Sequence, residues 1–183
     1  MIAVHARYRG REKRRAEVVR RSAAALSTLP GVGEFDIVGV EDIRAHMENP
    51  EAALNVIMAL LSDGNWAIGL GITHDGAALY SATEAVGTRP ATVAVTVDAP
   101  DAGTSAEDIA AALALLGHVV HKRTLEGREA TALLRSGLNQ NEAAAELGIT
   151  KQAMSQRLRA AGWRAEQAGW KLVLNLVTRA SGA

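Results

Sequence analysis

Apolar and polar residues are patterned along the first hundred residues in a way that predicts strands and helices in turn. Four segments with alternating or continuous apolar residues are predicted to be strands: Ile2–Tyr8, Glu34–Val40, Trp66–Thr73 and Ala91–Val97. Three segments with helical apolar spacing are predicted to be helices: 11–29, 52–61 and 77–86. This order predicts a compact α/β sandwich of the split βαβ kind, with helices covering one face of a four-stranded sheet.

Beyond this region the sequence has only helical patterns. The turn-rich segment Pro100–Ser105 is the predicted linker. We therefore expect an α+β protein with two units: an acidic α/β domain over residues 1–100 and a helical module over 105–183, which should fold on its own.

Residues 139–161 have the pattern of two short helices joined by a tight turn. Asn139 and Glu142 form a predicted capping box, Gly148 suits a turn with a positive φ, and Thr150 can cap the second helix. The inward-facing residues would be Ala144, Leu147, Ala153, Met154 and Leu158. The pattern is typical of a DNA-binding helix-turn-helix, here over 125–161, followed by a terminal helix over 162–178.

The outer face of the second helix has the side chains that read DNA. Gln can pair with adenine edges, Arg and Lys with guanine or phosphate, and Ser with either, and no acidic residue lies between Lys151 and Arg159. We expect residues 150–161 to enter the major groove of double-stranded DNA, with Arg128 or Lys171 near further phosphates. The candidate DNA-binding residues are Thr150, Lys151, Gln152, Ser155, Gln156, Arg157, Arg159 and Arg164. An ordinary helical hairpin with a polar face is the alternative.

Charge is distributed unevenly in a chain whose formal net charge is zero. Residues 1–21 carry +6, residues 22–121 carry −11 and residues 122–183 carry +5. The acidic body repels phosphate and the basic C-terminal segment attracts it, so we expect phosphate contacts in the C-terminal segment. The absence of cysteine excludes disulfides, thiolate zinc fingers and a cysteine nucleophile. With no secretory signal and no apolar run of membrane-spanning length, we expect a cytoplasmic protein without a membrane partner.

Two parts of the chain resemble known families. Ala144–Leu158, with the pattern Ala-x-x-Leu-Gly-Ile-Thr…Met-Ser-x-x-Leu, resembles the helix-turn-helix of bacterial transcription regulators. From about Leu113 on, the chain is similar to SatD-like proteins, in which such a unit is followed by a Gly-Trp and a final helix, here from Gly162-Trp163. The N-terminal half of that family resembles the palm of nucleotidyl and diguanylate cyclases. The resemblance implies a ferredoxin-like, palm-type domain over residues 1–100.

Several features that a palm-type enzyme needs are missing. The first strand has no acidic residue, and Gly33-Glu34-Phe35 lacks the aspartate of the diguanylate cyclase signature loop. Glu41-Asp42 could hold a metal but is also typical of a solvated strand end. His118 and His121 lack the partners of a zinc site and suit the negative end of a helix. We expect a degenerate palm with no catalytic residue, no metal and no cofactor.

Trp163 and Trp170 fall on one face of the terminal helix together with Leu174 and Val177. They must pack either against their own domain or against a second copy. A single helix-turn-helix rarely binds tightly alone, so we expect a homodimer. The sequence thus predicts a sequence-specific DNA-binding transcription regulator. A ligand- or nucleotide-sensing domain with DNA binding as its output, and a palm-type nucleotide enzyme, are the alternatives, and any small-molecule effector stays unspecified.

Overall fold

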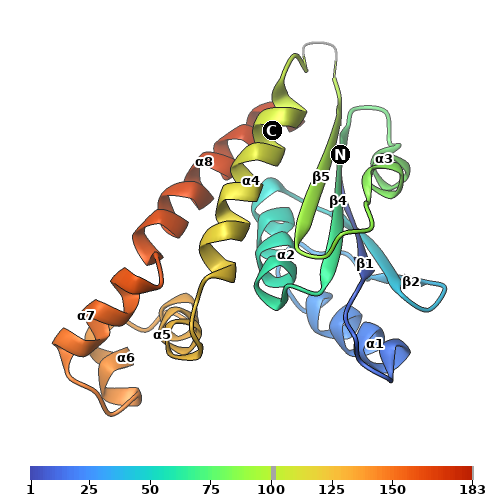
Figure 1. Ribbon diagram of the computed structural model, residues 1–183. Coiled ribbons are helices and arrows are strands. Elements are labelled where there is room, and N and C mark those ends of the chain that lie inside the picture. Colours follow the sequence, from blue (N-terminus) through green and yellow to red (C-terminus); the bar gives the residue numbers. More distant parts are fainter. Residues whose placement is uncertain (100–101, 183) are drawn as a thin grey trace.

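The computed structural model describes residues 1–99 and 102–182 and has a mixed α and β fold (Figure 1). One sheet contains the five strands β1 (Ile2–Tyr8), β2 (Asp36–Val38), β3 (Asp42–Met47), β4 (Trp66–Thr73) and β5 (Thr92–Asp98). Within the described residues the helices are α1 (Arg15–Leu26), α2 (Pro50–Asp63), α3 (Ala78–Ala85), α4 (Ser105–His121), α5 (Leu125–Arg135), α6 (Gln140–Glu146), α7 (Lys151–Ala160) and α8 (Trp163–Ser181). The α+β class predicted from the sequence is confirmed.

The sheet has the strand order β2-β3-β1-β4-β5. β1 pairs antiparallel with both β3 and β4, and β4 pairs in parallel with β5. The sequence predicts four strands, and β3 is the one that it misses. Asp42–Met47 alternates polar and apolar residues, and Ile43, Ala45 and Met47 are buried, so its pattern is that of a half-buried strand. The strand predicted over 34–40 shortens to β2, whose three residues are all exposed.

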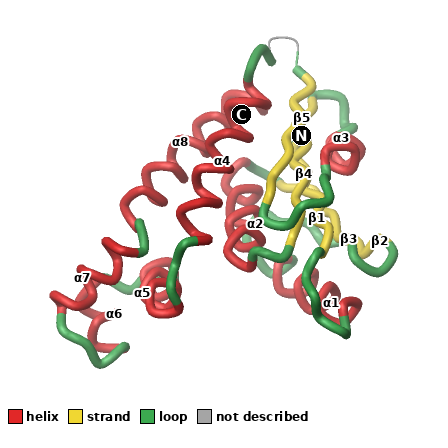
Figure 2. The backbone as a smooth tube through the Cα atoms, viewed as in Figure 1, coloured by secondary structure: helices red, strands yellow, loops and turns green. Residues whose placement is uncertain are grey.

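Helices cover both faces of the sheet, which corrects the prediction that they cover one. Alternate residues of β1, such as Val4 and Tyr8, join the main core with α1 and α2. The helix α3 packs on the opposite face (Figure 2), above Gly69 and Gly71 of β4. A Cβ on either glycine would overlap a backbone oxygen of α3, so these two glycines allow the helix to pack closely on the strand.

The helices α4 and α8 belong to the same core as the sheet. They run side by side in opposite directions, with α4 against β5 and α8 against α2 (Figure 1). Leu113 and Leu116 of α4 and Val173 and Val177 of α8 all lie in the main core. One apolar core therefore continues across the predicted boundary at 100–105. Residues 100 and 101 of the predicted linker lie outside the described residues.

The helices α5, α6 and α7 form a separate small cluster at one end of the α4–α8 pair (Figure 1). Its core consists of the buried residues Ala130, Ala143, Ala144, Met154 and Leu158. This is the segment over which the sequence predicts a helix-turn-helix. No helix in the described part of the chain is long and apolar enough to cross a membrane.

Candidate nucleic-acid interface

The helix α6 begins with the capping box that the sequence predicts. The Asn139 side chain accepts hydrogen bonds from the backbone N–H groups of Asn141 and Glu142, at 2.9 and 3.1 Å. The Glu142 carboxylate accepts in return from the Asn139 N–H at 2.8 Å. These bonds satisfy N–H groups that the first turn of a helix leaves without partners, and they fix where α6 starts.

The turn between α6 and α7 also follows its local signals. Gly148 has φ of +61°, in the left-handed region that favours glycine, as predicted. The Thr150 hydroxyl accepts from the Ala153 N–H at 3.1 Å and so caps α7. The Ile149 N–H donates to the Ala144 carbonyl at 3.0 Å, which ties the turn back to α6. The two helices thus have a defined relative orientation.

The predicted inward residues are found on the inner side of this pair. Ala144, Met154 and Leu158 are buried, whereas Leu147 and Ala153 are half-buried. Ala130 of α5 completes the cluster, so α7 packs on α5 as well as on α6. Because the inner face of α7 is covered from two sides, its opposite face is the one available to a partner.

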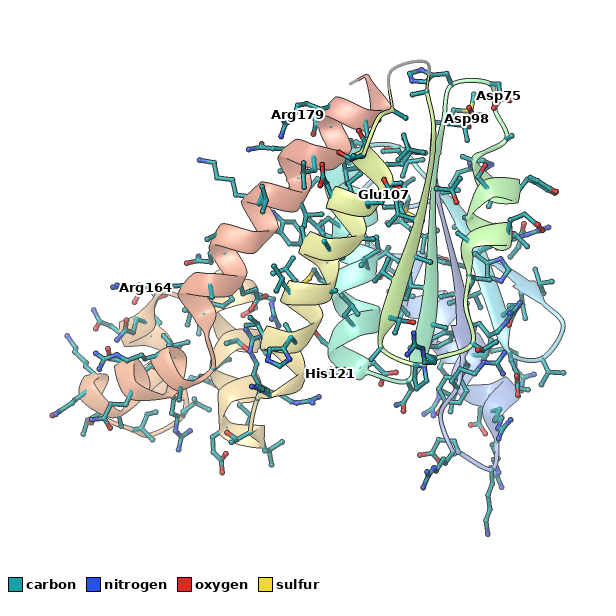
Figure 3. The ribbon with its side chains drawn as sticks, turned by 45° about the horizontal axis from the view of Figure 1, so that its top comes forward. Asp75, Asp98, Glu107, His121, Arg164 and Arg179 are labelled. Carbon is teal, nitrogen blue, oxygen red and sulfur yellow. The ribbon has the colours of Figure 1, made fainter. Side chains whose placement is uncertain are left out.

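Most of the predicted DNA-binding residues lie on the open face. The exposed members are Thr150, Lys151, Gln152, Gln156, Arg159 and Arg164, and the half-buried ones are Ser155 and Arg157. Arg164 lies in the first turn of α8, beside α7 (Figure 3). No acidic residue occurs in α7. The face combines glutamine amides with basic side chains, which is the chemistry that hydrogen-bonds base edges and attracts phosphate.

One basic residue in this region has another partner, and a second lies near an acidic side chain. The exposed Glu126 has a lowered pKa, chiefly through its own backbone N–H and the Thr124 hydroxyl, with a smaller contribution from the positive charge of Arg157. Arg128, a predicted phosphate contact, donates to the Ser62 carbonyl at 3.0 Å and so joins α5 to the end of α2. Lys171, the other predicted phosphate contact, is exposed on α8 two turns beyond Arg164.

A buried charged cluster connects the α5–α7 segment to the body, and the sequence analysis does not identify it. The side chains of Arg123 and Glu166 are only 2% and 6% exposed and form an ion pair. Arg135 of α5 also donates to Glu166, through Nη2 at 2.6 Å and Nε at 3.0 Å. Arg123 further donates through Nε to the Ala161 carbonyl at the end of α7, at 2.8 Å. This Arg123–Glu166–Arg135 cluster therefore ties the ends of α4 and α7 to α5 and α8.

The acidic pair Glu41-Asp42 is surrounded by basic partners. Asp42 accepts from Arg7 at 2.8 Å and from His5 Nε2 at 3.0 Å. Glu41 pairs with Arg9 and Arg15, at 2.9 and 2.6 Å. Across residues 1–99 and 102–182, no group of three His, Asp or Glu side chains is arranged to hold a metal ion. The pair thus ties β3 to β1 and α1 by ion pairs.

The two histidines considered for zinc both lie in the last turn of α4. Both are exposed, and the ring of His121 (Figure 3) lies against Gly64, the residue that ends α2. The sequence predicts this position, at the carboxyl end of a helix.

Comparison of the chain with protein-family models, with curated proteins and with solved structures found no match. The resemblance to SatD-like proteins therefore depends on the sequence motifs given above.

Proposed function

We propose that this protein is a sequence-specific DNA-binding protein, a bacterial transcription regulator that inserts α7 into the major groove as the recognition helix of a helix-turn-helix formed by α6 and α7. The observation that carries the proposal is the exposed face of α7, which has no acidic residue. The α6–α7 pair that holds this face has side-chain caps at both helix starts and a glycine in the turn. This combination of an amide-rich outer face with basic flanks fits base readout and phosphate contact together.

The residues divide into two roles. Gln152 and Gln156 are one helical turn apart and exposed, so both can reach base edges on the same side of α7. Lys151, Arg159 and Arg164 are exposed at the start, the end and just beyond α7, where phosphates flank a helix in the groove. Arg157 and Ser155 are half-buried, so only part of each side chain is available to DNA.

The N-terminal part serves as the scaffold in this proposal. The chain order β1-α1-β2-β3-α2-β4 and the antiparallel neighbours β2-β3-β1-β4 support a ferredoxin-like, palm-type sandwich, extended by α3 and β5. The pairing of Glu41 and Asp42 with arginines supports a degenerate palm without catalysis.

We also propose a homodimer, since two-fold pairing places two recognition helices about 34 Å apart on one side of the duplex. Trp163 and Trp170 are half-buried, and Trp170 packs against the main core. The exposed leucines of the α4–α8 pair, Leu115 at 69% and Leu172 at 49%, are the better candidates for contact between copies.

The test begins with selection of bound fragments from genomic DNA by the purified protein, followed by affinity measurements on the selected duplex. We expect affinity to fall steeply with salt. Gln152→Ala and Gln156→Ala should each cost about 1–3 kcal/mol on the selected duplex and little on unrelated DNA. Asn175→Ala, an exposed change on α8, serves as the control. Equal losses on both DNAs would mean that α7 contacts only the backbone.

A further inference from the structure

A cavity lies where α2, α5 and α8 meet, and the proposed function does not use it. Its volume is about 540 Å³, within the range of small-molecule sites. Met58 and Ala59 line it from α2, Arg135 from α5, and Trp163 and Trp170 from α8. The lining thus comes both from the body and from the segment that carries the DNA-reading helices.

The two tryptophans give this cavity a flat apolar lining. They are seven residues apart, which places them on the same side of α8, and both are only half-buried. Part of each indole is therefore left uncovered by the chain. The Arg135 guanidinium carbon already lies over the Trp163 ring, 5.8 Å from its centre, so the cavity brings indole and guanidinium groups together. A planar aromatic ring can pack against the uncovered parts of the two indoles.

The charged cluster beside the cavity favours an anion. Glu166 also lines the cavity, but its carboxylate is already held by Arg135 and by Arg123, which is buried behind the lining. The cluster therefore has two positive charges against one negative charge. The Arg135 side chain is 38% exposed and uses Nε and Nη2 on Glu166, while a guanidinium has five N–H donors. It can therefore donate hydrogen bonds to a second carboxylate.

We propose that this cavity binds a planar aromatic carboxylate, with its ring against Trp163 and Trp170 and its carboxylate on Arg135. A ligand bound there contacts α2 on one side and α5 and α8 on the other, so it joins the body to the DNA-reading segment. The site itself depends only on the cavity, whereas its use as an effector site rests on the proposed function.

The test uses naphthoate as the probe and the full chain without DNA. Titration is followed through the indole N–H signals by nuclear magnetic resonance. We expect the signals of Trp163 and Trp170 to shift and saturate, and that of Trp66, buried in the sheet, to stay unchanged. Naphthamide, which has the same rings without the charge, should bind about tenfold more weakly or worse.

A matched pair of variants locates the site. Ala59→Phe adds a ring to the cavity at an exposed position of α2 and should abolish the shifts, while Ala111→Phe at an exposed position of α4 should leave them intact. The proposal fails if naphthoate gives no saturable shift. It fails equally if the amide binds as tightly as the acid, or if Ala59→Phe binds like the unmodified protein.

The effector role has its own measurement, the affinity for the selected duplex with and without saturating naphthoate. We expect a several-fold change, because a ligand that contacts both parts favours the relative arrangement in which it binds best, and DNA binding depends on that arrangement. If naphthoate binds and the affinity for DNA stays the same, the proposed effector role is wrong but the proposed binding site is supported. If the chain binds no specific DNA under either condition, the proposed function fails independently of the site.

Discussion

His5 is a histidine that the sheet and α3 bury beside a carboxylate. Its Nε2 lies 3.0 Å from Asp42 Oδ2, and its Nδ1 lies 2.9 Å from the Thr83 hydroxyl. Burial lowers the pKa of His5, and the hydrogen bond to Asp42 opposes this without cancelling it. Burial alone would raise the pKa of Asp42, but hydrogen bonds from Arg7 and His5 outweigh it and hold that pKa below its usual range. A neutral histidine thus lies beside an ionised aspartate near neutral pH.

This arrangement predicts that the protein loses stability as the pH falls below the ordinary histidine pKa of 6.5. The imidazole of the unfolded chain then binds a proton, whereas the buried imidazole of the folded chain does not. Proton binding stabilises the unfolded state, so the free energy of unfolding falls. Denaturant unfolding between about pH 7 and about pH 5 should show the decline. His5→Gln should flatten it, and His46→Gln, at an exposed position, should not. A decline that persists unchanged in His5→Gln would assign the effect to other groups.

Among the elements, those with local signals were predictable from the sequence. Asn139 with Glu142, Gly148 and Thr150 each act within a few residues of their own position, and the structure has all of them in the predicted roles. The alternation of β3 is also visible in the sequence, but its pairing was not predictable by the same reasoning. Its charged residue Asp42 is matched by Arg7 on the neighbouring strand, and such a partner becomes visible only once the register is known.

The Arg123–Glu166–Arg135 cluster could not be predicted from the sequence, for the same physical reason. Arg123 and Glu166 are 43 residues apart, and their sequence surroundings are those of ordinary solvated helix ends. Only the return of α8 along α4 brings the two side chains together. The helix caps and the turn of the candidate interface could thus be predicted from the sequence, whereas the long-range contacts that hold it on the body could not.

The cluster predicts a large effect of Glu166→Gln. Removing this carboxylate charge leaves Arg123 buried without a counter-charge, which typically costs about 3–5 kcal/mol. We expect lower thermal stability and weaker binding to the selected duplex. Glu129→Gln, at an exposed position of α5, is the matched control and should change neither. Unchanged stability in Glu166→Gln would show that Arg123 finds another partner.

At the scale of the whole molecule, the continuous core determines whether a fragment of the chain can fold alone. The sequence predicts that residues 105–183 fold alone, yet Leu113, Leu116, Val173 and Val177 pack in the core of the sheet. Exposing each such side chain costs about 1.5–3 kcal/mol. We now expect the 105–183 fragment to lack cooperative thermal unfolding and to self-associate. A cooperative, monomeric melt followed by circular dichroism would show instead that these helices need no sheet.

The proposed dimer makes a second prediction for the whole molecule. Light scattering should give the mass of two chains. In Leu172→Glu the mass should fall to that of one chain, and specific DNA binding should weaken at the same time. Tyr80→Glu, at a site 69% exposed on α3, is the control. Trp170→Glu should reduce folding stability rather than only dissociate the dimer, since Trp170 packs against the main core. A monomer that binds the selected duplex at full affinity would contradict the dimer.

The chain enters and leaves the α5–α7 segment at nearly the same point. Arg123, just before the segment, donates to the carbonyl of Ala161 at its end, and a Cβ on Gly162 would lie 2.9 Å from Val119. A segment whose ends meet in this way is an insertion between two paired helices. We expect that another segment with the same end spacing, and with an arginine facing Glu166, could replace it while the sheet and the α4–α8 pair stay intact. Under the proposed function, such an exchange would change the DNA sequence that the protein reads and keep the body that holds the segment.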